Sequence, residues 1–188
     1  MPATSFQRQS IARNQLNVLA GPFDERSVRK NLQEATAGEV IAGRICHEDG
    51  NGQAVLGLEG IASPVSLPLY AWTNASEPNT RRDNLTPGGD VELGMMPGGS
   101  LAFFRHNAPN ELVTTEFQGL AADPVGTPLT AYNTVAASDA DATLNGQFRT
   151  RVASEPVVGY LTRSSFKQAD GMTVIAFTPT WIPGAYTP

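Results

Sequence analysis

Residues 90–106 read DVELGMMPGGSLAFFRH and contain the clearest β-hairpin signal in the chain. Two apolar segments flank the sequence PGGS at 97–100, and a turn rich in Gly and Pro between two such segments is typical of a hairpin. Side chains on a strand alternate between its two faces, so Phe103 and Phe104 are expected to point to opposite sides of the sheet. This segment predicts a β protein.

A second hairpin is predicted nearer the N-terminus. Residues 39–47 (EVIAGRICH) lead into the turn sequence DGNG at 49–52, and a second strand follows through Val55 and Leu58. Further short strands, each bounded by Gly, Pro, Asn or Asp, are predicted at 112–117, 127–132, 148–152, 157–163 and 172–178. Many short strands with punctuated turns indicate a sandwich or a barrel.

Composition agrees with an all-β fold. The 188 residues include 18 Gly and 14 Pro, and only 16% are charged, against about 25% in ordinary globular proteins. These values exclude a helical bundle or a coiled coil, whereas the hydrophobic fraction of 40% is enough to build a core. We expect a single β-sandwich or jelly-roll-like barrel with an extended N-terminal arm and at most one short helix.

The length suits one domain that carries extended segments. Residues 1–22 are rich in Gln, Asn, Ser and Arg with isolated apolar residues, and they are predicted to form an extended N-terminal arm. The β domain is expected over 23–178. Residues 179–188 (PTWIPGAYTP) are too rich in proline for a central strand and are predicted to be a docked C-terminal tail.

Two segments interrupt the predicted series of strands. The stretch from Asp24 to Ala35 contains helix formers, with Asp24 as a possible N-cap and Gly38 as a possible end, and it predicts one short helix. Residues 67–87 contain three prolines and are predicted to be a long loop excursion on the surface. Loops of this length are uncommon and usually serve a function or contact a partner.

Charge is unevenly distributed. The net charge is −5, but residues 1–30 carry five basic and two acidic side chains, which leaves −8 on the remainder. An acidic body argues against nucleic-acid and anionic-membrane partners, while the basic arm suits an acidic protein surface. No segment approaches the roughly 20 apolar residues of a membrane helix. No secretory signal is recognised at the N-terminus, so synthesis in a cytoplasm is expected.

Catalytic motifs are few. Cys46 and His47 are adjacent on a predicted strand and therefore point to opposite faces, so they cannot form a dyad with one another. A pairing of Cys46 with His106 is conceivable, but a lone Cys in a strand is more often a small buried hydrophobe. The sequence DADAT at 139–143 matches a phosphatase signature, yet it lacks the preceding buried strand and is interpreted as a polar loop. We therefore expect no catalytic site, metal or cofactor.

The order of strands and turns resembles a known family. The sequences GEVIAGRI (38–45), PGGDVEL (87–93) running into GSLAFF (99–104), and DPVGTPLT (123–130) are similar to segments of the small all-β cement or decoration proteins of tailed-bacteriophage capsids. Residues 146–152 followed by VVGYL at 157–161 resemble the family's closing strands. The resemblance covers roughly residues 36–178, and the long excursion, the arm and the tail depart from it.

The resemblance implies a non-enzymatic virion protein, made in the host cytoplasm, that binds the outer surface of the head and clamps neighbouring major capsid subunits. It also implies a symmetric homo-oligomer, with a homotrimer favoured and a homodimer possible. Extended arms suit such a role because multivalency multiplies modest contact energies. The expected contact residues are Phe6, Arg8, Arg13, Leu16, Trp181 and Tyr186.

Three other functions are open at this stage. A head-completion or tail protein of the virion would form rings. A carbohydrate-binding β-sandwich would stack sugars on exposed aromatic side chains such as Trp72 or Trp181. A small β-fold hydrolase would depend on Cys46 or His106.

Overall fold

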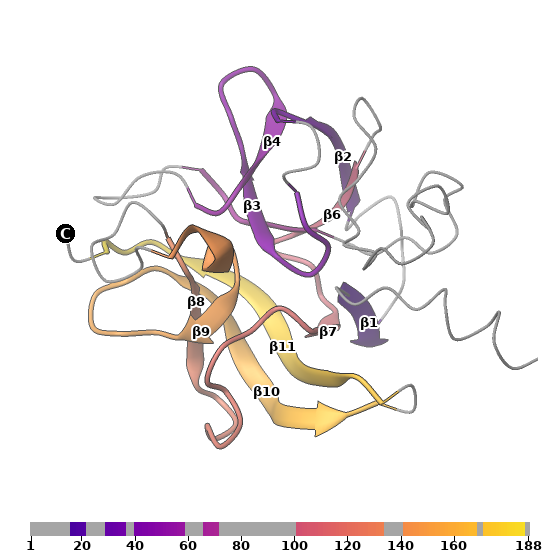
Figure 1. Ribbon diagram of the computed structural model, residues 1–188, viewed down its shortest axis with the longest axis vertical. Helices are drawn as coiled ribbons and strands as arrows, with labels where there is room; N and C mark the ends of the chain where they lie inside the picture. The colour runs from indigo at the N-terminus through magenta and orange to yellow at the C-terminus, as the bar shows by residue number, and fades with distance from the viewer. Residues whose placement is uncertain are drawn as a thin grey trace, which may run out of the picture.

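The fold consists of two β-sheets packed against each other (Figure 1). The computed structural model describes residues 16–21, 29–36, 40–58, 66–71, 101–133, 141–168 and 171–186. The regular structure of these residues is eleven strands and one 3₁₀ turn, η3 (Ala142–Leu144). The all-β fold is therefore as predicted.

The first sheet closes into a small barrel with the strand order β2-β4-β3-β5-β6. Its strands are β2 (Arg29–Glu34), β3 (Ile45–Glu48), β4 (Gln53–Leu56), β5 (Leu69–Ala71) and β6 (Leu101–Arg105). The predicted hairpin around 49–52 is confirmed as β3–β4. Strand β2 closes the barrel because it pairs with β6 on one side and, in parallel, with β4 on the other.

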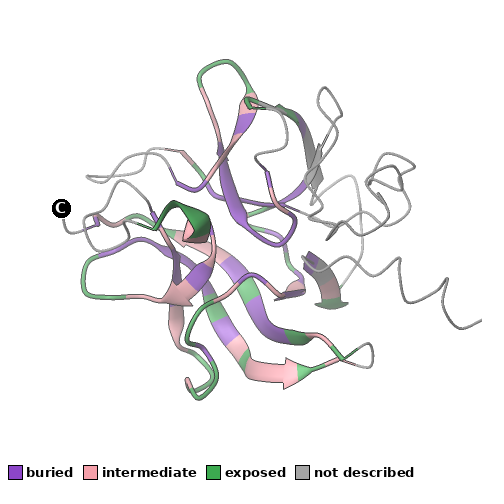
Figure 2. Ribbon diagram, viewed as in Figure 1, coloured by how far each residue is buried: buried purple, intermediate pink, exposed green. Residues whose placement is uncertain are grey.

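The second sheet has six strands in the order β1-β7-β11-β10-β8-β9. They are β1 (Leu16–Ala20), β7 (Glu111–Thr114), β8 (Pro128–Ala131), β9 (Phe148–Thr150), β10 (Val157–Lys167) and β11 (Thr173–Ile182). The long β10–β11 hairpin forms its centre (Figure 1). Buried and exposed positions intermix along β10, because this strand covers the core with one face and meets solvent with the other (Figure 2).

Alternation of side chains on the barrel strands produces two separate cores. Phe103 points into the barrel and Phe104 points out of it toward the second sheet, so the prediction of opposite faces is confirmed. The barrel interior is filled by Leu32, Val40, Cys46, Ala54, Leu69, Ala71 and Phe103. Between the sheets, the rings of Tyr70, Phe148 and Phe177 pack with centroids 4.5–6.1 Å apart. Tilted and offset ring pairs of this kind contribute beyond their buried area.

A buried polar joint also connects the two sheets. The Arg44 guanidinium, just before β3, lies 2.7 Å from the Glu116 carboxylate, just after β7. Arg44 also donates to the carbonyl oxygens of Thr143 and Asn145. In the main core, the Tyr70 hydroxyl donates to the carbonyl oxygens of Val158 and Thr180. These bonds fix the barrel on the sheet, because buried polar groups are costly unless they are satisfied.

The predicted helix at Asp24–Ala35 is wrong for its described part. Residues 29–34 form strand β2 instead, paired with β6 from Arg29↔Phe104 to Leu32↔Leu101. The sequence RKNLQE favours a helix by intrinsic propensity, but propensity is a weak preference that tertiary pairing overrides. Here the pairing supplies backbone hydrogen bonds and buries Leu32.

Three predicted loop or arm segments also contain strands. Residues 16–20 of the predicted arm pair with β7 as an edge strand, and residues 69–71 of the predicted excursion form the buried strand β5. Strand β11 continues through Pro179 to Ile182. Proline is tolerated there because pairing with β7 ends at Phe177. The predicted strand at 90–96 and most of the excursion lie outside the described residues.

Candidate functional site

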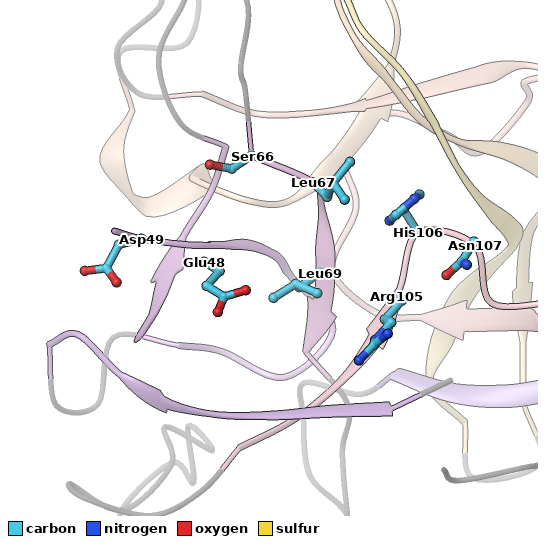
Figure 3. Close-up of a pocket in the computed structure, with 8 residues that line it drawn as sticks. All are labelled: Glu48, Asp49, Ser66, Leu67, Leu69, Arg105, His106 and Asn107. Carbon is cyan, nitrogen blue, oxygen red and sulfur yellow. The ribbon is translucent and has the colours of Figure 1, made fainter. Parts of the chain in front are cut away.

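A cavity of about 440 Å³ lies at one end of the barrel (Figure 3). It is formed where strands β3, β5 and β6 meet the segments that adjoin them. The lining residues are Glu48, Asp49, Ser66, Leu67, Leu69, Arg105, His106 and Asn107.

Strand periodicity explains why these side chains converge. Cys46 pairs with Leu69, and Leu69 pairs with Arg105, so the three residues lie in one row across the barrel wall. Glu48 is two residues beyond Cys46 and shares its inward-facing side, and Arg105 is likewise two residues beyond the inward-facing Phe103. The cavity is therefore the mouth of the barrel, and the buried Leu69 forms its floor.

The mouth has walls of opposite charge. Glu48 and Asp49 lie on the β3 side, whereas Arg105 and His106 lie on the β6 side. Backbone N–H groups of Gln53 and Asn51 donate to the Asp49 carboxylate and lower its pKa. Burial, followed by the nearby charge of Arg105, lowers the pKa of His106. At neutral pH, His106 is therefore uncharged and Arg105 supplies the positive wall.

A second surface feature is formed by exposed apolar side chains on three segments around strand β8 of the six-stranded sheet. Val125 is 70% exposed, Val152 is 61% exposed and Tyr160 is 38% exposed. All three adjoin the start of strand β8, because Pro128 pairs with Tyr160 and accepts a hydrogen bond from the backbone of Arg151, the residue before Val152, while Val125 precedes Pro128 by three residues. We call Val125, Val152 and Tyr160 the apolar rim.

The loop that carries Val152 is held by a buried ion pair. Arg149 contacts both carboxylate oxygens of Glu155 at 2.8 Å, and the same carboxylate accepts the backbone N–H of Val152. Within this loop, Ala153 has a φ of 45°, which is an uncommon conformation for a residue other than glycine. Strained backbone of this kind persists only when surrounding contacts impose it. Contacts of the surrounding residues therefore hold the tip of the loop in this conformation.

The loop that carries Val125 is connected to the same frame. The Thr150 hydroxyl donates to the Asp123 carboxylate at 3.0 Å, and Gly126 donates through its backbone to Leu161 on β10. Sequence analysis missed the rim because its members lie on three separate segments. The available signal was an apolar residue inside a turn sequence, as in DPVG at 123–126.

The structure separates the residues that we expected to contact a partner. Phe6, Arg8 and Arg13 lie outside the described residues. Leu16 is completely buried and Tyr186 is 2% exposed, both within the chain's own main core. The Tyr186 hydroxyl donates to the carbonyl oxygen of Ala131 at 2.6 Å.

Leu16 and Tyr186 therefore serve the fold of this chain, and we remove them from the contact set. Hydrophobic burial explains both placements, because the core takes up the apolar side chains that a short edge strand and a terminal segment bring to it. Trp181 is half-buried and packs against the same core, and it keeps part of its surface accessible.

The residues considered as catalytic candidates make contacts within the fold. Cys46 is buried in the barrel interior. On the opposite face of β3, the imidazole of His47 donates from Nδ1 to the carbonyl oxygen of Gly57 at 2.9 Å. Asp141 accepts from the backbone and hydroxyl of Thr143 and caps η3, in agreement with a polar loop.

The described parts of the chain offer neither a metal-binding cluster nor a membrane-spanning helix. Within them, no three His, Cys, Asp or Glu side chains are grouped so that they could hold a metal ion. The described residues also contain no helix that is long and apolar enough to cross a membrane.

Comparison with protein-family models, with curated proteins and with solved structures finds no match.

Proposed function

We propose that this chain is a non-enzymatic structural protein of a tailed-bacteriophage virion that binds the outer surface of the head and clamps neighbouring major capsid subunits. It acts as a symmetric homo-oligomer, with a homotrimer favoured. The observation that carries this proposal is the apolar rim, since it presents exposed apolar side chains on rigid loops of a rigid body.

The rim has the properties of a protein-binding surface. Association costs less when the contacting groups are already ordered, and the Arg149–Glu155 ion pair orders the loop of Val152 before any partner arrives. Burial of exposed apolar surface favours association, and tyrosine is among the side chains that contribute most to interface binding energy. Val125, Val152 and Tyr160 are thus suitable anchors, and Trp181 together with the N-terminal residues Phe6, Arg8 and Arg13 would add further contacts.

The second support is the resemblance to capsid cement proteins. The segments that carry it in the described residues fold as strands or turns of the two sheets, including β3, β6, β8 and the start of β10. A rigid body suits a clamp, because force between capsid subunits is transmitted only when the clamp itself does not deform. The buried Arg44–Glu116 joint between barrel and sheet provides that rigidity.

Co-sedimentation with phage heads that lack this protein tests the proposal. We expect the full-length chain to travel with the heads at stoichiometric occupancy. Deletion of residues 1–15 tests the arm and leaves strand β1 intact, whereas a longer deletion would remove the buried Leu16. Failure of the full-length chain to bind any heads would contradict the proposal.

Two pairs of substitutions test the rim itself. Val125→Asp combined with Val152→Asp places two charges on the rim and should weaken head binding about tenfold or more, since burying an unpaired charge is costly. Thr36→Asp combined with Thr173→Asp adds the same charge at exposed positions away from the rim and should leave binding unchanged. Equal binding by both pairs would show that the rim is not the contact surface.

The other candidate functions give different results in the same experiments. A head-completion or tail protein would bind at one vertex or in the tail and would reach only a few copies per particle. A carbohydrate-binding module would bind glycans as a monomer and would ignore the heads. Light scattering of the purified protein measures its oligomeric state, for which we expect a trimer.

A further inference from the structure

The mouth of the barrel has three neighbouring walls of different chemistry. Strand β5 lies between β3 and β6, so Leu69 is flanked on one side by Cys46 and on the other by Arg105, and Glu48 follows two residues after Cys46. Figure 3 shows Leu69 between the side chains of Glu48 and Arg105. Adjacent strands are about 4.8 Å apart, and Glu48 lies two residues, or about 7 Å, beyond the row that contains Leu69 and Arg105. The acidic and basic walls are therefore about 12 Å apart.

The apolar part of the mouth extends to its lip. Leu69 is buried at the floor, and Leu67 at the lip is 49% exposed. Exposed leucine beside a cavity with charged walls suits side chains that have an aliphatic stem and a charged end, because such a stem packs on apolar surface while the end reaches a charged partner.

The charged groups differ in what they are able to offer a ligand. The Asp49 carboxylate accepts three hydrogen bonds from its own turn, two from backbone N–H groups and one from the Asn51 amide. It adds negative potential beside the inward-facing Glu48. Arg105 is exposed, and His106 beside it is neutral at pH 7 because burial and Arg105 depress its pKa. A single cation thus dominates one wall and a carboxylate pair dominates the other.

We propose that the barrel mouth binds an extended peptide segment of a partner protein, with a basic side chain facing Glu48 and an acidic side chain two residues away facing Arg105. Residues two apart on an extended chain point to the same side and are about 7 Å apart. Two long side chains therefore span the distance of about 12 Å between the walls, with their stems on Leu67 and Leu69. This inference rests on the proposed function, in which the partner is the major capsid protein.

Capped pentapeptides test the charge rule directly. The probe is acetyl-Gly-Lys-Thr-Glu-Gly-amide, compared with the corresponding Gln-Thr-Gln, Lys-Thr-Lys and Glu-Thr-Glu peptides. Titration is followed by NMR of the full-length protein at low ionic strength. We expect the Lys-Thr-Glu peptide to bind about two- to fivefold more tightly than each of the others, as each exposed ion pair contributes modestly. The amide signals of Leu67, His106 and Asn107 should shift.

Reversing the charge of the basic wall gives a more decisive test than the peptide series alone. Arg105→Glu makes both walls acidic, so the preference should change from the Lys-Thr-Glu peptide to the Lys-Thr-Lys peptide. Arg105 is exposed, so this variant should fold normally. Lys167→Glu, an equal charge change at an exposed position on β10, should keep the original preference. The proposal is overturned if the neutral peptide binds as tightly, if the signals shift elsewhere, or if Arg105→Glu keeps the original preference.

Head binding separates this inference from the proposed function. Arg105→Glu should reduce occupancy on the heads, and Lys167→Glu should not. If Arg105→Glu binds heads as well as the natural chain does, the mouth is not the contact and the capsid proposal stands. If the natural chain does not bind heads at all, the capsid proposal fails, whatever the peptides show.

Discussion

Arg44 and Glu116 form an ion pair of 2.7 Å across the junction between the barrel and the six-stranded sheet. Their side chains are 10% and 8% exposed, and the Gln147 amide donates to the same Glu116 oxygen at 3.1 Å. Two residues 72 positions apart in the chain are therefore fixed at the point where the two sheets meet. The pair holds the two bodies in one orientation.

Glu116→Gln should destabilise the protein, because it leaves the Arg44 charge buried without a counter-charge. Breaking one side of a buried ion pair costs about 3–5 kcal/mol. The double variant Arg44→Met/Glu116→Leu removes both charges and should lose less stability than Glu116→Gln alone. Urea unfolding measures both free energies. If the free energy of unfolding of Glu116→Gln equals that of the natural chain within experimental error, the Arg44–Glu116 pair has no stabilising role.

Inside the main core, Tyr70 on the barrel is hydrogen-bonded to strands β10 and β11 of the six-stranded sheet. Tyr70→Phe removes the hydroxyl donor and leaves the buried carbonyl oxygens of Val158 and Thr180 without it. The expected loss is about 1–3 kcal/mol in urea unfolding. Tyr132→Phe is the matched control. Tyr132 is half-buried beneath the Arg149 guanidinium, and its loss should be within about 0.5 kcal/mol.

Burial also makes Tyr70 a source of alkaline instability. Complete burial raises the pKa of the Tyr70 phenol, whereas in the unfolded chain it titrates near 10. Above about pH 10 the unfolded state releases a proton that the folded state retains, so stability falls as the pH rises. Tyr70→Phe should have a shallower decline in unfolding midpoint between about pH 9 and pH 11. An unchanged slope would contradict the assignment.

A close approach of two backbones is predicted to make Gly146 irreplaceable. Gly146 has a φ of 77°, and a Cβ at this position would lie 2.6 Å from the carbonyl oxygen of Ile45 on the barrel. Gly171 has a φ of 87°, but a Cβ there would have no atom within 4 Å. Gly171→Ala should therefore cost only the backbone strain of about 1–2 kcal/mol, and Gly146→Ala clearly more. Thermal unfolding of the two variants tests the difference.

Local patterns predicted most of the strands. The alternation in LAFFR places Phe103 and Phe104 on opposite faces, and the DGNG sequence at 49–52 forms the β3–β4 turn. These features depend on neighbouring residues only, so a single sequence contains them. Strand β2 was predicted as a helix, because its conformation depends on pairing with β6, about 70 residues later in the chain.

The candidate sites could not be predicted for the same reason. The barrel mouth combines Glu48, Leu67 and Arg105, which meet only through the registers of three strands. The apolar rim combines Val125 and Val152 from two loops, and their proximity depends on the pairing of β8 with β9 and β10. Sequence reasoning instead selected residues near the termini, and the structure places Leu16 and Tyr186 inside the core.

In the strained loop beside the apolar rim, we expect a substitution to stabilise the protein, whereas the substitutions above are expected to destabilise it. Ala153 has a φ of 45°, a conformation that costs an L-residue about 1–2 kcal/mol and glycine almost nothing. Ala153→Gly should therefore stabilise the protein by about 0.5 kcal/mol, after the greater entropy of glycine in the unfolded chain is subtracted.

Ala121→Gly is the matched control, because Ala121 is exposed and does not have a positive φ. It should destabilise the protein by about 0.5 kcal/mol, since only the effect on the unfolded chain applies there. Thermal unfolding of both variants gives the two signs. If both substitutions destabilise equally, Ala153 is not strained. The loop of Val152 would then be unstrained and held by the Arg149–Glu155 ion pair together with the hydrogen bonds between Ser154 and Ala185.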